Sequence, residues 1–347
     1  MIRRPRYRGG RAVTPARRFL IMTLSALAVL AAAVALVALW AVWSYEGPGP
    51  RATTGASTDV VLRQGASLPE IASTLRRAGV IGSSPLFVAV AQATHAGRRL
   101  KAGEYDIPSH ASMATVLGLI RDGKVVKHQV TIPEGVTSEV VNEILERADF
   151  LTGSAPVAPE GAVLPETYEA QRGEDRAAVL QRMMDARDKL LATLWDRRRS
   201  SLPYQSPDQA VILASVVEKE TAKPDERPRI AAVFVNRLQH NMRLESDPTV
   251  IYGLTRGRAL GHGIRASELA SHTPYNTYLI DGLPPTPIGN PGRASLAAAL
   301  DPPRSDDLYF VADGTGGHVF APTFEQHQKN VARWRSIEQA AKAAAGK

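Results

Sequence analysis

Residues Ala210–Thr221 read AVILASVVEKET, an apolar run that ends in two glutamates flanking a lysine. Asp208 stands where a helix N-cap is expected, and the apolar residues recur at helical spacing, which predicts a buried helix. Glu218 falls at the edge of the apolar stripe, whereas Lys219 and Glu220 point elsewhere. A carboxyl removed from water favours its protonated form near neutral pH and can act as a general acid. From this stretch alone, an ordinary boundary residue at a helix end is the simpler interpretation of Glu218.

The composition is that of a folded protein of two or three domains. The chain has 347 residues, of which 44% are hydrophobic and 22% charged, enough to bury a sizeable core. Seven arginines within residues 1–18 account for most of the net charge of +8, and subtracting them leaves +1. The chain after residue 18 is therefore close to neutral and offers no broad positively charged surface for nucleic acid. The absence of cysteine excludes disulfides and thiolate chemistry and fits an oxidising compartment.

A long apolar segment near the N-terminus predicts a membrane anchor. Phe19–Trp43 has 25 residues and no charge, which is long enough to cross the hydrocarbon core as a helix. Arginines precede it and the first acidic residue, Glu46, follows it, so the positive-inside rule places the N-terminus in the cytoplasm. We therefore expect a cytoplasmic basic tail at 1–18 and a retained transmembrane helix at 19–43. The alternatives are a cleaved signal peptide, for which the span is too long and lacks a clear cleavage site, or a buried core helix.

The rest of the chain divides into a linker and two larger regions. Residues 44–57 are rich in Gly, Pro, Ser and Thr and predict a linker. Residues 58–108 show the pattern strand, helix, helix, strand, which resembles a LysM-like module that grips N-acetyl amino sugars of cell-wall glycan. Residues 109–147 read as an extension of this arm, and residues 148–347 as the main domain. The predicted fold class is α+β, with a single N-terminal transmembrane helix, a LysM-like βααβ subdomain and a larger α+β domain.

The sequence lacks the motifs of several kinds of catalytic site. The eight histidines form no HExxH motif or paired short spacing, so we expect no metal site. The sequence DGTGGH at residues 313–318 lies between two strand-like runs and predicts a hairpin turn instead of a phosphate loop. Ser215 has no G-x-S-x-G context, and no lysine has a recognisable cofactor context. We therefore expect neither a nucleotide nor an organic cofactor.

The second half of the chain resembles the endolytic murein transglycosylases, the MltG/YceG-like family, in six blocks. They are, in order, ASVVEKET, FVNRL, MRLESDPTVIYG, TPYNTY, GLPPTPIGNPG and LYFVADGTGGHVFAPTFEQH. Looser similarity upstream, in KAGEYDIP, VTIPEG and LPETY, extends the resemblance over nearly the whole part after the anchor. The resemblance implies lytic cleavage of nascent peptidoglycan between N-acetylmuramic acid and N-acetylglucosamine, leaving 1,6-anhydro-muramic acid ends. It also implies that Glu218 is catalytic, that residues 148–347 form a periplasmic catalytic domain on an inner-membrane anchor, and that peptidoglycan synthases are possible partners.

The chemistry needs one carboxyl that acts first as an acid and then as a base. A glycosidic bond breaks when a proton reaches the leaving oxygen as the ring carbon gains oxocarbenium character. As a carboxylate, Glu218 can then take the proton of the muramic acid C6 hydroxyl, whose oxygen closes the anhydro ring. Glu220, two positions on, is the rival acid. Side chains in the other blocks suit sugar hydroxyls, acetamido groups and pyranose faces, although many also suit loop contacts: Asn236, Arg237, Asp247, Thr249, Tyr252, Tyr275, Asn276, Thr277 and Tyr278.

Two other functions fit the same residues. A glycan-binding scaffold that recruits synthesis proteins would use the LysM-like arm and leave Glu218 replaceable. A hydrolytic muramidase would pass the sugar to water, because the product depends on whether water is excluded from the site. The identity of the cleavage product distinguishes the enzymes, and the absence of cleavage identifies the scaffold.

Overall fold

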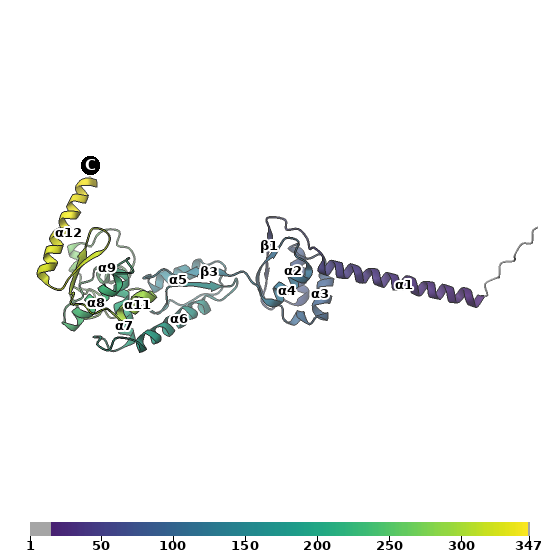
Figure 1. Ribbon diagram of the computed structural model, residues 1–347, viewed down its shortest axis with the longest axis horizontal. Helices are drawn as coiled ribbons and strands as arrows, with labels where there is room; N and C mark the ends of the chain where they lie inside the picture. The colour runs from purple at the N-terminus through teal and green to yellow at the C-terminus, as the bar shows by residue number, and fades with distance from the viewer. Residues whose placement is uncertain (1–14, 346–347) are drawn as a thin grey trace, which may run out of the picture. The chain divides into compact units, whose positions relative to one another are not determined.

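The computed structural model describes residues 15–345, so most of the predicted cytoplasmic tail lies outside the described residues. Contacts divide the chain into two compact units, Met1–Val126 and Lys127–Lys347, which are described separately (Figure 1). Within the described residues, helices are interspersed with three two-stranded antiparallel sheets. The predicted mixed α+β class is confirmed.

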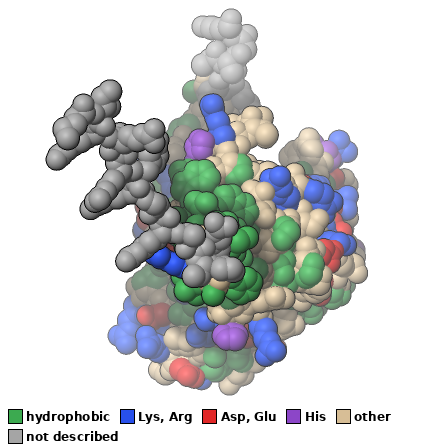
Figure 2. Space-filling model, turned by 90° about the vertical axis from the view of Figure 1, so that its right-hand side faces the viewer, with side chains coloured by type: hydrophobic (Ala, Val, Ile, Leu, Met, Phe, Trp, Pro, Cys, Tyr) green, Lys and Arg blue, Asp and Glu red, His purple; other side chains and the backbone are tan. Residues whose placement is uncertain are grey.

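The predicted membrane span is part of a single long helix, α1 (Pro15–Glu46). Its segment Phe19–Glu46 is long and apolar enough to cross a membrane, and no part of the most apolar stretch is buried. Figure 2 views the protein from its N-terminal side and shows hydrophobic side chains gathered on that face. The helix ends at Glu46, and a Cβ on the next residue, Gly47, would collide with the carbonyl oxygen of Trp43. A signal sequence also has these properties, so retention of the helix as an anchor stays a prediction.

Of the predicted linker 44–57, residues 47–56 lie between α1 and the first strand and hydrogen-bond to residues 109–110 of the same unit. Gly49 N donates to His110 O at 3.1 Å, and His110 N donates to Pro50 O at the same distance. A Cβ on Gly49 would collide with the carbonyl oxygen of Ala111, so only glycine fits this crossing. The Gly and Pro content that predicts a linker here serves a close backbone approach.

The first unit has the predicted strand, helix, helix, strand order. Its elements are β1 (Ser57–Leu62), α2 (Leu68–Arg77), α3 (Ser84–Ala93), the short 3-10 helix η1 (Ala96–Arg98), β2 (Gly103–Pro108) and α4 (Met113–Asp122). Ser67 and Ser83 cap the two helices through hydrogen bonds to backbone N–H groups. Strands β1 and β2 pair antiparallel with Val60 opposite Tyr105. Tyr105 is fully buried in the core of this unit.

The second unit begins earlier than the predicted catalytic domain. Residues 127–147, assigned above to the arm, make their contacts here. Strand β3 (His128–Thr131) pairs antiparallel with β4 (Thr167–Ala170), and α5 (Ser138–Arg147) and α6 (Arg176–Asp196) bury a shared apolar cluster. The division by contacts therefore falls at Val126 and not at residue 147.

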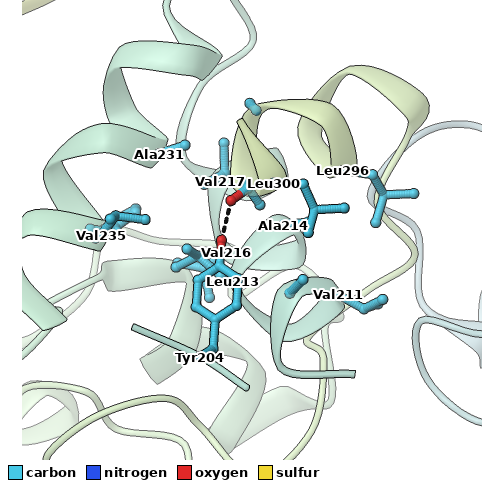
Figure 3. Close-up of a cluster of buried hydrophobic side chains, with 14 of the residues drawn as sticks. Tyr204, Val211, Leu213, Ala214, Val216, Val217, Ala231, Val235, Leu296 and Leu300 are labelled. Atoms are coloured by element: carbon cyan, nitrogen blue, oxygen red, sulfur yellow. Dashed lines mark hydrogen bonds between the residues drawn. The ribbon is translucent and has the colours of Figure 1, made fainter. Parts of the chain in front are cut away.

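The predicted central helix is α7 (Pro207–Glu220), and every residue from Ala210 to Glu218 is buried. It packs against α8 (Arg227–Gln239) and α11 (Arg293–Leu300). Figure 3 shows the cluster, with the Tyr204 hydroxyl donating to the Ala299 carbonyl, and labels Val211, Leu213, Ala214, Val216, Val217, Ala231, Val235, Leu296 and Leu300. Burial of apolar surface stabilises such a core by roughly 25 cal/mol for each Å² removed from water.

The predicted N-cap of α7 is wrong. Ser206 caps the helix and its side chain accepts a bond from Gln209 N at 3.3 Å, whereas Asp208 lies in the first turn. Pro207 occupies the first helical position, where its missing N–H and fixed φ are tolerated. The proline therefore moves the start of the helix upstream of Asp208.

The remaining elements surround this core: α9 (Asp247–Thr255), α10 (Ala266–Leu269), β5 (Tyr309–Ala312), β6 (His318–Ala321) and α12 (Phe324–Ala345). The hairpin predicted from DGTGGH joins β5 to β6 and is confirmed. The Asp313 carboxylate accepts bonds from the backbone N–H groups of Thr315 and Gly317 and fixes this turn.

Candidate active site

Glu218 lies in the last turn of α7, and only 3% of its side chain is exposed. Its Oε2 accepts a hydrogen bond from the backbone N–H of Gly292 at 2.8 Å. Its Oε1 lies 3.0 Å from Nη2 of Arg227. One oxygen is thus held by a backbone donor and the other by an ion pair.

Two loops cross next to Glu218, one from the VTIPEG block and one from the IGNPG block. They pair through backbone hydrogen bonds, with Gly135 N donating to Asn290 O at 2.8 Å and Asn290 N donating to Val136 O at 2.9 Å. A Cβ on Gly289 would lie 2.6 Å from the Gly135 carbonyl oxygen, so a glycine permits the crossing. The two blocks, distant in sequence, form one wall beside the carboxylate.

Ser215 holds one of these loops to α7. Its hydroxyl donates to the Ile212 carbonyl at 2.7 Å and accepts from Ile288 N at 3.0 Å. Ser215 is fully buried and therefore positions the loop that carries Gly292.

Sequence analysis missed two charged residues at the site, Glu134 and Arg227. Arg227 begins α8, and its Nη2 lies 3.0 Å from carboxylate oxygens of both Glu134 and Glu218. The Glu134 side chain is 42% exposed. Glu134 could have been recognised because it lies in the VTIPEG block of the family resemblance. Arg227 lies between two of the similar blocks, so nothing in the sequence pointed to it.

A second, half-buried carboxyl, Glu160, lies within hydrogen-bond distance of Asn290. It accepts bonds from Ser138 N at 2.9 Å, the Tyr252 hydroxyl at 3.0 Å and Asn290 Nδ2 at 3.4 Å. Burial raises the pKa of Glu160, although the bonds from Ser138 and Tyr252 oppose the change. Glu160, Tyr252 and Arg256 contribute to the lining of a hollow of about 270 Å³.

One predicted sugar-binding residue, Tyr252, lines this hollow, and a second, Tyr275, packs against Tyr252. The rings of Tyr252 and Tyr275 pack edge to face with centroids 4.9 Å apart. The Arg256 guanidinium lies over both rings, and the Tyr275 hydroxyl is 2.9 Å from that of Thr286. Tyrosine rings and an arginine suit a sugar with acidic substituents, and their contact with substrate stays a prediction.

Other predicted sugar-binding residues, on α9 and after α10, form hydrogen bonds within the protein. The hydroxyls of Thr249 and Thr277 are 2.8 Å apart, and both side chains are fully buried. Asn276 Nδ2 donates to two backbone carbonyls at 2.8 Å. The Tyr278 hydroxyl donates to Asp247 at 2.7 Å. These contacts fix the loops before α9 and after α10, and substrate binding by these residues stays a prediction.

Asn236 and Arg237 hold the segment after α11. Asn236 Nδ2 donates to the carbonyls of Ser305 and Asp307 at 2.7 and 2.9 Å. Arg237 is buried and donates to the Leu308 carbonyl at 2.7 Å. A role for either residue in substrate binding remains a prediction beside this structural one.

Glu220 projects away from Glu218, as expected. It accepts a bond from the Ser246 hydroxyl at 2.9 Å. Burial, together with the nearby Asp247 carboxylate, raises the pKa of Glu220 to about 7, against the opposing effects of the Ser246 bond and Arg237.

Within residues 15–345 no group of three or more metal-ligating side chains is present.

The raised pKa of Glu220 makes the stability of the protein depend on pH. The ordinary value is 4.5 and the folded value about 7, so the stabilisation is present below pH 4.5 and is lost as pH rises toward 7. Across this window the free energy of unfolding of the wild type should fall, relative to Glu220→Gln, by up to about 3 kcal/mol. Denaturant unfolding of both proteins at several pH values measures this difference. Parallel pH dependences would contradict it.

The chain is similar to one protein family and to several known proteins. Residues 60–333 match the model of the YceG-like family. The chain is 30% identical over 322 residues to the endolytic murein transglycosylase of Streptococcus pneumoniae, a match that covers 79% of this chain and 57% of that protein. For the endolytic murein transglycosylase of Bacillus subtilis the identity is 34% over 201 residues, with 57% and 51% covered. The chain thus spans about half the length of these curated relatives.

A solved structure has a similar fold. The crystal structure of a yceG-like protein from Listeria monocytogenes superposes with a TM-score of 0.50 at 27% sequence identity. The match covers 80% of this chain and 99% of that chain. The similarity therefore includes most of the fold that positions the site.

Proposed function

Because the chain belongs to the YceG-like family, we propose that it is an endolytic murein transglycosylase. It cleaves peptidoglycan strands between N-acetylmuramic acid and N-acetylglucosamine and leaves 1,6-anhydro-muramic acid ends. The observation that carries this proposal is the setting of Glu218, a carboxyl at the end of a buried helix fixed by Gly292 and Arg227. Relatives that are 30% and 34% identical to the chain are named for the same activity.

Glu218 transfers one proton in each of two steps. In the first it protonates the glycosidic oxygen, the C1–O bond breaks, and the ring carbon gains oxocarbenium character. In the second the carboxylate accepts the proton of the C6 hydroxyl, whose oxygen bonds to C1 and closes the anhydro ring. No water is added, and Glu218 returns to its protonated form. The described geometry, with a backbone donor at one oxygen and the Arg227 cation beside the other, suits the carboxylate of the second step.

The rate enhancement has two sources. Proton transfer by a positioned carboxyl contributes about 10² to 10⁴-fold. An oriented hydroxyl of the same sugar adds a large effective molarity, which requires side chains that hold the muramic acid ring. Tyr252, which lines the hollow of about 270 Å³, and Tyr275, which packs against Tyr252, have the rings for this role.

The proposed location follows from α1. The apolar helix anchors the protein in the inner membrane as a single pass, with the arginine-rich N-terminus in the cytoplasm and the catalytic unit in the periplasm. In this position the enzyme reaches nascent strands beside peptidoglycan synthases and ends their elongation.

Digestion of purified, peptide-free glycan strands by the full-length protein in detergent tests the proposal. Endolytic cleavage predicts that the median strand length falls early, before disaccharides accumulate, when products are separated by chromatography. Anhydro ends on the fragments support lytic transglycosylation. Strands that bind without being cut would identify a scaffold.

A further inference from the structure

One arginine is shared by two carboxylates at the site. Nη2 of Arg227 lies 3.0 Å from Glu218 and 3.0 Å from Glu134, so the two acceptor oxygens are no further apart than twice that distance. The Arg227 side chain is only 10% exposed, and its Nε is buried without an acceptor. Its charge is therefore poorly hydrated and acts mainly on these two carboxylates.

The backbone around Glu134 is shaped to bring it to this arginine. Gly292 has a φ of −74°, which any residue adopts, yet a Cβ there would overlap the Glu134 carboxyl and lie 2.8 Å from its Cγ. A side chain at 292 would therefore displace the Glu134 side chain from this position. Gly135 has a φ of +75°, in the left-handed region that favours glycine, and its Cβ position lies 3.3 Å from Glu218 Cγ. Both glycines thus let the Glu134 loop lie against Glu218.

We propose that Glu134 is a positioning residue that offsets the charge of Arg227 and so lets Glu218 carry the proton that starts the reaction. An unopposed guanidinium 3.0 Å away favours the carboxylate, which cannot donate. The negative charge of Glu134 at the same nitrogen reduces this effect. Glu134 also keeps an acceptor on Arg227 when Glu218 is protonated, so the buried cation is not left unpaired. This inference rests on the proposed function of Glu218.

Other charged groups near Glu218 act more weakly. Lys219, on the same helix, is exposed, and its stem lies beside Gly135. Arg293 follows Gly292, is 61% exposed, and pairs with Glu166 at 2.9 Å. Solvent screens exposed charges of this kind. Glu160 reaches the neighbouring Asn290, where several donors hold it.

The pH dependence of glycan cleavage tests the role of Glu134. In Glu134→Gln of the full-length protein, the alkaline limb of the pH–rate profile should move to lower pH by about 0.5 to 1 unit, because the protonated donor becomes harder to maintain. Glu134→Asp, which keeps the charge, should recover part of this shift. Arg227→Gln should move the limb the opposite way.

Glu166→Gln is the matched control. Glu166 is 41% exposed and accepts a 2.9 Å bond from an arginine, as Glu134 is 42% exposed and accepts one at 3.0 Å. Only Glu134 shares its arginine with Glu218. A purely structural or general charge effect would move both profiles equally, and that result would overturn the inference.

A second measurement separates this inference from the proposed function. In protein labelled with ¹³C at glutamate carboxyls, the Glu218 resonance, assigned with Glu218→Gln, is titrated in wild type, Glu134→Gln and Glu166→Gln. Its midpoint should fall in Glu134→Gln alone. If the wild type fails to cleave glycan, the proposed function fails while this titration still decides the electrostatic claim. An unmoved midpoint would overturn the claim even in an active enzyme.

Discussion

Replacement of Glu218 by glutamine is expected to lower the rate of glycan cleavage by about 10² to 10⁴-fold, the usual contribution of a positioned proton donor. The amide can neither give up a proton to the glycosidic oxygen nor take one from the C6 hydroxyl. Its carbonyl oxygen can still accept the hydrogen bond that Gly292 N now donates. The variant should therefore fold, and initial rates on glycan strands, with circular dichroism as a check, measure the effect.

Glu220→Gln is the control for this prediction. Both glutamates lie in the last turn of α7, but Glu220 bonds to Ser246 and not to the loop of Gly292. Cleavage by Glu220→Gln at neutral pH should stay within tenfold of the wild type. A large loss in this variant with activity retained in Glu218→Gln would exchange the roles of the two carboxyls.

Arg237→Ala should destabilise the second unit by about 3 to 5 kcal/mol, the usual effect of removing a buried, fully bonded charged side chain. Arg237 donates to the carbonyls of Leu308, Arg243 and Leu244 and to the carboxylate of Glu245. These groups lose their donor at once, and the empty volume adds to the loss. Denaturant unfolding measures the change.

Arg243→Ala provides the comparison for Arg237→Ala. The Arg243 side chain is 46% exposed and pairs with the exposed Asp281 at 2.9 Å. An exposed pair of this kind contributes about 0 to 1 kcal/mol, so the loss of stability should be small. If Arg237→Ala were as stable as Arg243→Ala and had instead lost glycan binding, Arg237 would be a substrate contact and not a structural clamp.

Local patterns were sufficient for the elements with strong periodicity. The apolar run in α7, the uncharged stretch within α1 and the order of β1, α2, α3 and β2 were all visible in the sequence. Helical spacing and strand alternation act over a few residues, so each could be recognised without the rest of the fold. The mixed α+β class and the family resemblance are confirmed for the same reason, since both rest on ordered local blocks.

The environment of Glu218 could not be predicted in this way. Its two donors, Gly292 and Arg227, come from other elements, and Glu134 lies 84 residues before it in the chain. No periodicity reports which loops cross over a helix end. Glycines that permit such crossings, including Gly49 and Gly289, look in sequence like ordinary linker or turn residues. The side-chain partners of the predicted sugar-binding residues were hidden for the same reason.

The central claim is tested most directly by whether cleavage adds a water molecule to the new muramic acid ends. Glycan strands are digested by the full-length protein in water enriched in ¹⁸O, and the new muramic acid ends are weighed by mass spectrometry. Internal closure by the C6 hydroxyl predicts ends lighter than hydrolysed ends by one water and free of ¹⁸O. Ends that are heavier by one water and carry ¹⁸O would contradict the account and identify a hydrolytic muramidase.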